Sequence, residues 1–407
     1  MRHLNTIVAT AIASAILIPS VPSQAESNAW LSFRGDGSSS ASSGPEVLDT
    51  TDQGNLVWST TMPGRSVAAP IVIGGLVVST SAEGPDEPNL FVTGLDVETG
   101  KVRWQQSFRA TGRPFHHPTS SGAAPTPASD GNRIVAFYSS NDLVCLDLDG
   151  NLVWYRGLGS DYPKAGNDVG MASSPVIVDG AVIVQVECQG DSFAAAIELE
   201  TGKNRWRISR PAASNWASPA AITRPNGSQE VILQSGSDLV AVDPANGTEL
   251  WRMDEPRASI PSATKGNGML LVPGSDLMAL RIGEGTGKPE VVWQESKLSP
   301  KNACVAIAGD RAYVLKGSVL IAASVESGET IWQQRLSGLG GTWASPVVAG
   351  DRIYIFDQSG VGLVVQDKGD EAEVVSTVEL GDGVLGSPAI ADGKLFIRSQ
   401  TKMFCFE

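Results

Sequence analysis

Short runs of hydrophobic residues, broken by polar turns, recur with regular spacing along this chain of 407 residues. The clearest unit is LVAVDPANGTELW at residues 239–251, where an apolar run leads into a turn at Gly247 and a second run ends at Trp251. This pattern predicts two strands joined by a hairpin. Tryptophan closes the same unit, in some cases a looser copy of it, at Trp58, Trp104, Trp154, Trp206, Trp251, Trp293 and Trp332. A period of roughly 40–50 residues that carries strands rather than helices predicts a β-propeller.

Two further positions of the unit account for its composition. A glycine that follows Thr, Asn or Ser supplies the positive φ that a tight hairpin with a bulge requires. The preceding strand carries a small residue, and we interpret this small size as the space into which the tryptophan ring packs. The small position is occupied by Gly94, Cys145, Ala196, Ala241, Ala279 and Ala322.

A second recurring phrase, two small residues followed by proline, is predicted to open each blade. It occurs as AAP at Pro70 and Pro125, SSP at Pro175, ASP at Pro219 and Pro346, and GSP at Pro388. Degenerate forms stand at residues 261–263 and 302–304, and the seventh unit has Val375 where a tryptophan is expected. Together the two phrases predict eight blades.

The two ends of the chain carry complementary parts of one unit. QGNLVW, which ends at Trp58, has no blade before it, and the C-terminal KMFCFE stops where a hairpin turn should follow. We therefore expect the N-terminal strand to complete the last blade, which closes the ring and removes open sheet edges. The expected fold is all-β, an eight-bladed propeller over residues 52–407.

The region before the propeller divides into two parts. Residues 1–25 have a polar start, an apolar stretch and small residues at Ser23 and Ala25, as in a cleaved secretory signal peptide. Residues 26–51 are interpreted as an N-terminal segment with a flexible Ser/Gly-rich link. Residues 34–36 of this segment spell the adhesion tripeptide RGD, a pattern short enough to arise by chance. Because no other apolar run is long enough to span a membrane, we expect a soluble protein without a transmembrane span. We also expect it to be a monomer, and to be periplasmic or secreted.

Charge and cysteine placement narrow the possible partners and bonds. Lys and Arg number 30 against 44 Asp and Glu, a formal net charge of −14, and no basic cluster is present. This argues against nucleic acids and anionic membranes as partners. The four cysteines are never adjacent, and Cys145 and Cys405 fall in blades that are not neighbours, so we predict free, buried thiols. The sequence also shows no ligand spacing of the zinc type.

Two tryptophans outside the repeat are the first candidates for binding. Trp216 and Trp343 each precede an ASP phrase, so both rings are expected near the mouth of the central channel. Exposed tryptophan is enriched at binding sites, although the same rings could instead plug the channel as packing. Two adjacent histidines, His116 and His117, lie in a long loop, where one could enter a site as a base or a metal ligand, although a polar contact within the loop is the favoured interpretation.

Polar residues in the loop GSDYPKAGNDVGM form a second candidate group. Its side chains could bind calcium, a cofactor or a sugar, or could serve only as turn formers: Asp161, Lys164, Asn167 and Asp168. Glu187 and Asp191 are weaker candidates of the same kind.

The D-x-x-T-G-x-x-x-W repeat resembles the tryptophan-docking motif of the pyrroloquinoline quinone (PQQ) repeat propellers. The segments WLSFRG and RPFHHPTSSGAAPTP are similar to those of BamB-like secreted propellers. The resemblance covers nearly all of the chain after residue 25 and implies an eight-bladed ring. The superfamily holds both quinoprotein alcohol dehydrogenases and a non-enzymatic assembly scaffold. The dehydrogenases commonly carry two adjacent cysteines against the quinone, which this sequence lacks. One propeller hosts many functions, so the resemblance specifies architecture rather than activity.

The preferred interpretation is a non-catalytic binding or assembly scaffold of the cell envelope. Its partner is expected to be an envelope protein or a small ligand at the channel mouth, with no cofactor and no catalytic residue. The first alternative is a quinoprotein-type oxidoreductase that holds PQQ and calcium in the channel. The second is a carbohydrate-binding propeller that uses the channel tryptophans.

Overall fold

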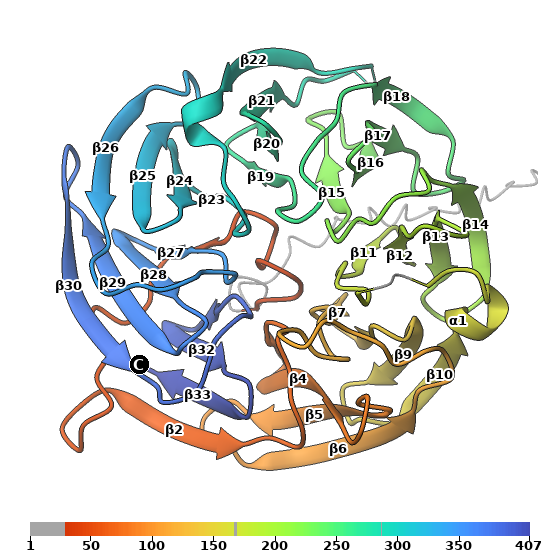
Figure 1. Cartoon of the computed structure of the whole chain (residues 1–407), viewed down its shortest axis with the longest axis horizontal. Helices are drawn as coiled ribbons and strands as arrows, with labels where there is room; N and C mark the ends of the chain where they lie inside the picture. The colour runs from red at the N-terminus through yellow and green to blue at the C-terminus, as the bar shows by residue number, and fades with distance from the viewer. Residues whose placement is uncertain (1–28, 167–168, 286) are drawn as a thin grey trace, which may run out of the picture.

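Eight β-sheets stand like blades around a central axis in the computed structural model, which describes residues 29–166, 169–285 and 287–407 (Figure 1). Seven sheets have four strands and one has five. The predicted eight-bladed β-propeller is confirmed. The proposed signal peptide, residues 1–25, lies outside the described residues. Beside the strands, the described chain forms the short helix α1 (Leu158–Asp161) and the 3-10 turn η2 (Ser296–Leu298), neither long enough to cross a membrane.

The first four blades follow one another in chain order. Blade one contains β3 (Ile71–Ile73), β4 (Leu76–Glu83), β5 (Asn89–Asp96) and β6 (Val102–Arg109). Blade two contains β7 (Ala128–Ser129), β8 (Arg133–Phe137), β9 (Asp142–Asp147) and β10 (Leu152–Gly157). Blade three contains β11 (Val176–Val178), β12 (Ala181–Val186), β13 (Phe193–Glu198) and β14 (Asn204–Ser209). Blade four contains β15 (Ala220–Thr223), β16 (Gln229–Gln234), β17 (Leu239–Val242) and β18 (Glu249–Met253).

The other four blades complete the ring. Blade five contains β19 (Thr264–Gly266), β20 (Met269–Pro273), β21 (Leu277–Arg281) and β22 (Glu290–Glu295). Blade six contains β23 (Ala306–Ala308), β24 (Arg311–Lys316), β25 (Val319–Ser324) and β26 (Thr330–Arg335). Blade seven contains β27 (Val347–Ala349), β28 (Arg352–Phe356), β29 (Val361–Asp367) and β30 (Ala372–Glu379), with β1 (Ser40–Ala41) added beside β27. Blade eight contains β31 (Ala389–Ala391), β32 (Lys394–Arg398), β33 (Lys402–Phe406) and β2 (Leu56–Thr61).

The N-terminal strand closes the ring, as the sequence predicts. Strand β2 pairs antiparallel with the C-terminal β33, with Trp58 opposite Cys405 (Figure 1). The other tryptophans have the same register relative to their small partners; Trp104, for example, lies opposite Gly94 just before a β-bulge. A Cβ at Gly94 would collide with the Trp104 ring, so at this position the small residue provides the space for the ring, as predicted.

Each docking tryptophan anchors its indole N–H as well as its ring. Five of them donate to a backbone carbonyl of the following blade at 2.7–3.1 Å: Trp58 to Val97, Trp104 to Leu148, Trp154 to Leu199, Trp206 to Pro244 and Trp293 to Val325. Trp251 donates instead to the buried carboxylate of Glu230, and Trp332 donates to Asp367. The Trp251 bond lies within blade four, whereas the other six cross to the following blade. Because a buried indole N–H needs an acceptor, these six bonds fix how neighbouring blades sit against each other.

Blade seven departs from the repeat and corrects one sequence assignment. The residue that follows its bulge and corresponds to the docking tryptophan is Ser376, which lies opposite Val364, and not Val375. The Ser376 hydroxyl donates to the carbonyl of Leu48 at 2.9 Å and accepts the Leu48 amide at 3.1 Å. Leu48 is 2% exposed and belongs to a hydrophobic cluster that spans blades seven, eight and one.

The neighbouring contacts show what Leu48 replaces. In blade one, the turn glycine Gly100 lies against the Trp58 ring of the preceding blade, and a Cβ there would come within 2.5 Å of the ring. The corresponding glycine of blade eight is Gly54, where a Cβ would collide with the carbonyl of Asp49. The stretch 48–49 therefore occupies the place that a tryptophan takes elsewhere in the ring.

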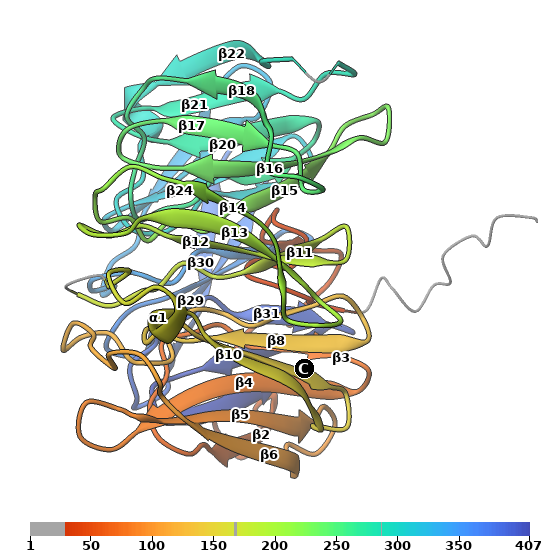
Figure 2. The same cartoon turned by 90° about the vertical axis from the view of Figure 1, so that its right-hand side faces the viewer.

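The chain before β1 is a channel segment, residues 30–39, that is hydrogen-bonded to the inner strands of several blades. Trp30 exchanges backbone hydrogen bonds of 2.9 Å with Val72 of blade one. Further along, Ile307 of blade six donates to the carbonyl of Ser38 at 2.8 Å, and Ser39, fully buried, donates to Pro346 of blade seven at 2.7 Å. Figure 2 shows this segment, in red, inside the ring on the side away from α1.

The RGD tripeptide lies within the channel segment, with Arg34 and Gly35 buried and Asp36 exposed. Arg34 is 4% exposed and donates to the carbonyl of Ala263 and to the hydroxyl of Thr264 in blade five. Asp36 accepts from both the amide and the hydroxyl of Ser38. The tripeptide thus ties the channel segment to the inner strands.

All four cysteines are free and buried, as predicted. Burial raises the pKa of Cys145 and of Cys405 to about 12, since each thiol lies in the small position beside a docking tryptophan. At neutral pH these two thiols stay protonated and unreactive.

Candidate functional site

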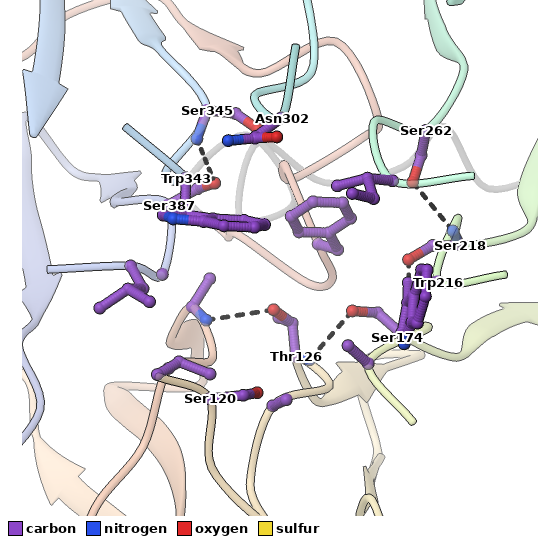
Figure 3. Close-up of a pocket in the computed structure, with 18 of the residues that line it drawn as sticks. Ser120, Thr126, Ser174, Trp216, Ser218, Ser262, Asn302, Trp343, Ser345 and Ser387 are labelled. Atoms are coloured by element: carbon purple, nitrogen blue, oxygen red, sulfur yellow. Dashed lines mark hydrogen bonds between the residues drawn. The ribbon is translucent and has the colours of Figure 1, made fainter. Parts of the chain in front are cut away.

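A cup of about 480 Å³ opens at the centre of the ring, on the side of the loops that lead into the innermost strands (Figure 3). Phe33 of the channel segment lines it from below, since the same residue also lines a second cavity whose walls include residues 29–37. The channel segment therefore separates the two cavities. The volume is in the range of about 300–1,000 Å³ typical of small-molecule sites.

The structure brings both candidate tryptophans to this cup. Trp216 and Trp343 line it from opposite sides (Figure 3). The Trp216 indole N–H donates to the carbonyl of Gly170 at 2.9 Å, which fixes its ring. Trp343 is 40% exposed, one of the most exposed large apolar side chains in the described chain.

A belt of side chains encircles the cup just before the innermost strands. In the belt, the backbone N–H of one blade donates to the side chain of the next at 2.8–3.2 Å (Figure 3). The accepting residues are Thr126, Ser174, Ser218, Ser262, Cys304, Ser345 and Ser387. All are at least nine-tenths buried or lie at the cup wall, so each bond satisfies an amide that would otherwise be unpaired.

The belt explains the small-small-Pro phrase and corrects its placement in blade two. The proline that corresponds to Pro175 and Pro219 is Pro127, not Pro125, because Thr126 provides the belt hydroxyl and β7 begins at Ala128. The belt has one gap, where blade one has Ala69 and offers no acceptor to the amide of Ser387. The Ser387 amide has no hydrogen bond within the described part of the chain.

The two histidines lie differently with respect to the cup. The His117 side chain lines it, and its Nδ1 is 2.8 Å from the hydroxyl of Thr119. His116 turns away, with its Nε2 3.3 Å from a carboxylate oxygen of Glu87. Glu87 is 6% exposed and also accepts from Ser121 and from the amide of Gly122. One histidine therefore faces the site and the other packs behind it.

Among the remaining polar candidates, those that the structure describes do not line the cup. Asp161 ends α1 and pairs with Arg156, and it is not part of the cup wall. Asn167 and Asp168 lie outside the described residues. The carbonyl of Lys164 accepts the amide of Asp191, whose carboxylate pairs with Arg207 at 2.6 Å.

Glu187 belongs to a buried ionic network between blades three and four. Its carboxylate accepts from Arg210 at 2.7 Å and from Gln185 at 2.8 Å. Arg210 also reaches Asp238 at 2.7 Å. Burial raises the pKa of Glu187, and the Arg210 guanidinium only partly offsets this shift. The network packs two blades together, and these four side chains do not line the cup.

No group of three or more His, Cys, Asp or Glu side chains that could hold a metal ion is present in the described chain. The described residues that line the cup also include no Asp, Glu, Lys or Arg. Sequence reasoning missed Phe33 and the belt. The signal for the belt was present, since Thr or Ser precedes the proline in five of the eight phrases.

Comparison with known proteins assigns the chain to a family. The family described as outer membrane protein assembly factor BamB matches residues 24–232 and 235–407. The chain belongs to this BamB family. A search of curated proteins returned no match.

Solved structures support the BamB-type fold. BamB from Moraxella catarrhalis is 17% identical, with 86% of this chain and 97% of that chain covered and a TM-score of 0.62. A europium-containing methanol dehydrogenase is 12% identical, with 93% and 91% covered and a TM-score of 0.71. Quinohemoprotein alcohol dehydrogenase from Comamonas testosteroni is 13% identical, with 93% and 80% covered and a TM-score of 0.65. At these identities the likeness shows the fold, which binding proteins and enzymes share.

Proposed function

We propose that this BamB-family propeller is a non-catalytic binding scaffold of the cell envelope that holds a ligand or partner in the cup. The observation that carries the proposal is the character of the cup. Two indole rings and Phe33 present apolar faces, the belt presents hydroxyl groups, and the described wall residues carry no fixed charge. A concave, largely apolar cup with a few convergent polar groups is typical of binding sites.

The described wall residues do not fit PQQ with calcium. PQQ carries three carboxylates, whose charge needs cationic partners when they are buried, and calcium requires about six to eight oxygen ligands, usually with carboxylates among them. The described wall offers neither cationic side chains nor carboxylates. We therefore derive no oxidation step from this site.

His117 alone does not make the cup catalytic. A general base works best when a second group orients its ring and a substrate proton lies within hydrogen-bond reach. The Nδ1 atom of His117 is engaged by the neutral hydroxyl of Thr119, and the nearby carboxylate of Glu87 is paired with His116. This arrangement suits a polar contact to a ligand better than proton transfer.

An envelope location agrees with membership of the BamB family and with the signal peptide predicted for residues 1–25. The monomeric state and the choice between periplasm and exterior remain predictions from the sequence.

A turnover assay tests the proposal. The purified protein is incubated with PQQ and calcium and assayed for dye-linked oxidation of alcohols and sugars. The Comamonas testosteroni quinohemoprotein alcohol dehydrogenase, similarly treated, serves as the positive control. We expect no turnover above the protein-free reaction. Saturable turnover that disappears in the Trp216→Ala variant would show that the cup is an active site and would refute the proposal.

A further inference from the structure

The belt leaves hydrogen-bond donors unused at the base of the cup. A hydroxyl group has one donor hydrogen and can accept as well. In the described structure, six belt hydroxyls accept a backbone N–H and none of them donates to a protein acceptor: Thr126, Ser174, Ser218, Ser262, Ser345 and Ser387. Because all six side chains line the cup, their O–H groups are available to acceptor atoms of a bound molecule.

Three aromatic rings line the same cup as these hydroxyl groups. Trp216 is held by its bond to Gly170, and Trp343 lies across the cup from it (Figure 3). The Phe33 ring below is backed by the guanidinium of Arg34, 4.9 Å from the ring centroid. The rings of Trp216 and Phe33, held in this way, offer their faces to a ligand with little loss of conformational entropy.

The described wall residues include no Asp, Glu, Lys or Arg, and this limits which ligands can bind. A charged group in the cup would give up its hydration and find no opposite charge among the described wall residues. A purely apolar group would cover the six hydroxyls and leave their donors unpaired, at about 1–3 kcal/mol for each fully buried group. The best ligand is therefore neutral, rich in acceptor oxygens, and flat enough to lie against indole rings.

We propose that the cup binds a neutral saccharide. A pyranose ring carries C–H groups on its faces, which pack on aromatic rings, and oxygens around its edge, which accept hydrogen bonds from the belt. This inference rests on the proposed binding function and adds the chemical class of the ligand. A hydrophobic side chain of a partner protein would match the rings but not the donors.

Calorimetric titration of the full chain tests the proposal. The neutral probes are maltotriose, cellotriose and tri-N-acetylchitotriose, and the charged controls are trigalacturonate and the deacetylated, cationic chitotriose. We expect saturable binding of at least one neutral trisaccharide, and affinity at least tenfold lower for both charged controls. If none of the three neutral probes binds at millimolar concentration, or a charged control binds as well, the proposal is overturned.

Variants assign the binding to the cup. Trp343→Ala should weaken binding of the neutral trisaccharide at least tenfold, and Trp343→Phe should retain part of the affinity because a ring face remains. Ile331→Ala is the matched control, since Ile331 is 37% exposed on β26 at the outer edge of blade six. Unchanged affinity in Trp343→Ala would overturn the proposal. If the neutral saccharides do not bind and the protein shows no PQQ-dependent turnover, only this inference is refuted. If the protein shows PQQ-dependent turnover, the proposed function is refuted.

Discussion

Replacing Leu48 with alanine should destabilise the protein, although Leu48 lies in the segment that precedes the repeats. Its side chain is buried in the place where the missing tryptophan of blade seven would dock. The change removes about three carbon atoms, or roughly 2.4 kcal/mol at about 0.8 kcal/mol for each buried carbon group. The cavity that remains raises the expected loss to about 3–4 kcal/mol.

Thermal unfolding followed by circular dichroism measures this loss. Unfolding entropy of about 2.1 cal/mol/K per residue gives roughly 0.8 kcal/mol/K for a chain of this length, so the melting temperature should fall by about 4–5 °C. Val47→Ala is the matched control, because Val47 is 44% exposed next to Leu48 and should change the melting temperature little. Equal melting temperatures for the two variants would refute the docking role of Leu48.

Three further changes test the belt, the acid stability and the thiols. Ala69→Ser should complete the belt, raise the unfolding free energy by about 1 kcal/mol and slow hydrogen exchange at the Ser387 amide; unchanged exchange would contradict the belt geometry. Burial opposes the charged form of Asp357, but hydrogen bonds from Ser359, Gly340 and Val361 outweigh it and lower its pKa. Because the folded pKa lies below the ordinary value of 3.8, this carboxylate stabilises the fold above that pH and the benefit is lost as the pH falls through the folded pKa. Asp357→Asn should therefore lower the melting temperature at pH 7 and flatten its decline below pH 3.8, and a parallel decline in both proteins would count against the assignment. Among the four thiols, Cys304 lines the cup, so a small neutral methanethiosulfonate should label it first, and Cys304→Ser should leave the native protein unlabelled until it unfolds; rapid labelling of that variant would contradict the burial of the other three.

The path of the channel segment could not be predicted from its sequence. Residues 30–39 show neither strand alternation nor helical periodicity, and their Ser/Gly content resembles that of a linker. Their order comes from partners on the inner strands of several blades, such as Val72, Ile307 and Pro346. Those partners are brought around one axis only when the ring closes.

The sequence predicted only part of the candidate site, because some of its contacts also form only when the ring closes. Trp216 and Trp343 could be assigned to the channel mouth because each precedes a phrase that marks an innermost strand. Asp161 could not be excluded from the site, because its pairing with Arg156 depends on how α1 folds back on β10. The belt hydroxyls were visible as a repeated residue type, but their bonds cross between blades and depend on the spacing of neighbouring sheets.

The sequence by itself determined the ring, because each blade is specified locally. A tryptophan, a turn glycine and a small residue opposite the ring, such as Trp104, Gly100 and Gly94, act within one blade or between neighbours in the chain. The tertiary structure decided which residues lie at the centre of the ring and which residue packs between blades seven and eight, where the docking tryptophan is missing. Phe33 at the base of the cup and Leu48 beside Ser376 are single contacts between segments far apart in sequence, and no repeat marks them. Repetition encodes interactions that recur with the period of the blades, whereas closure and plugging occur once and are set by three-dimensional packing.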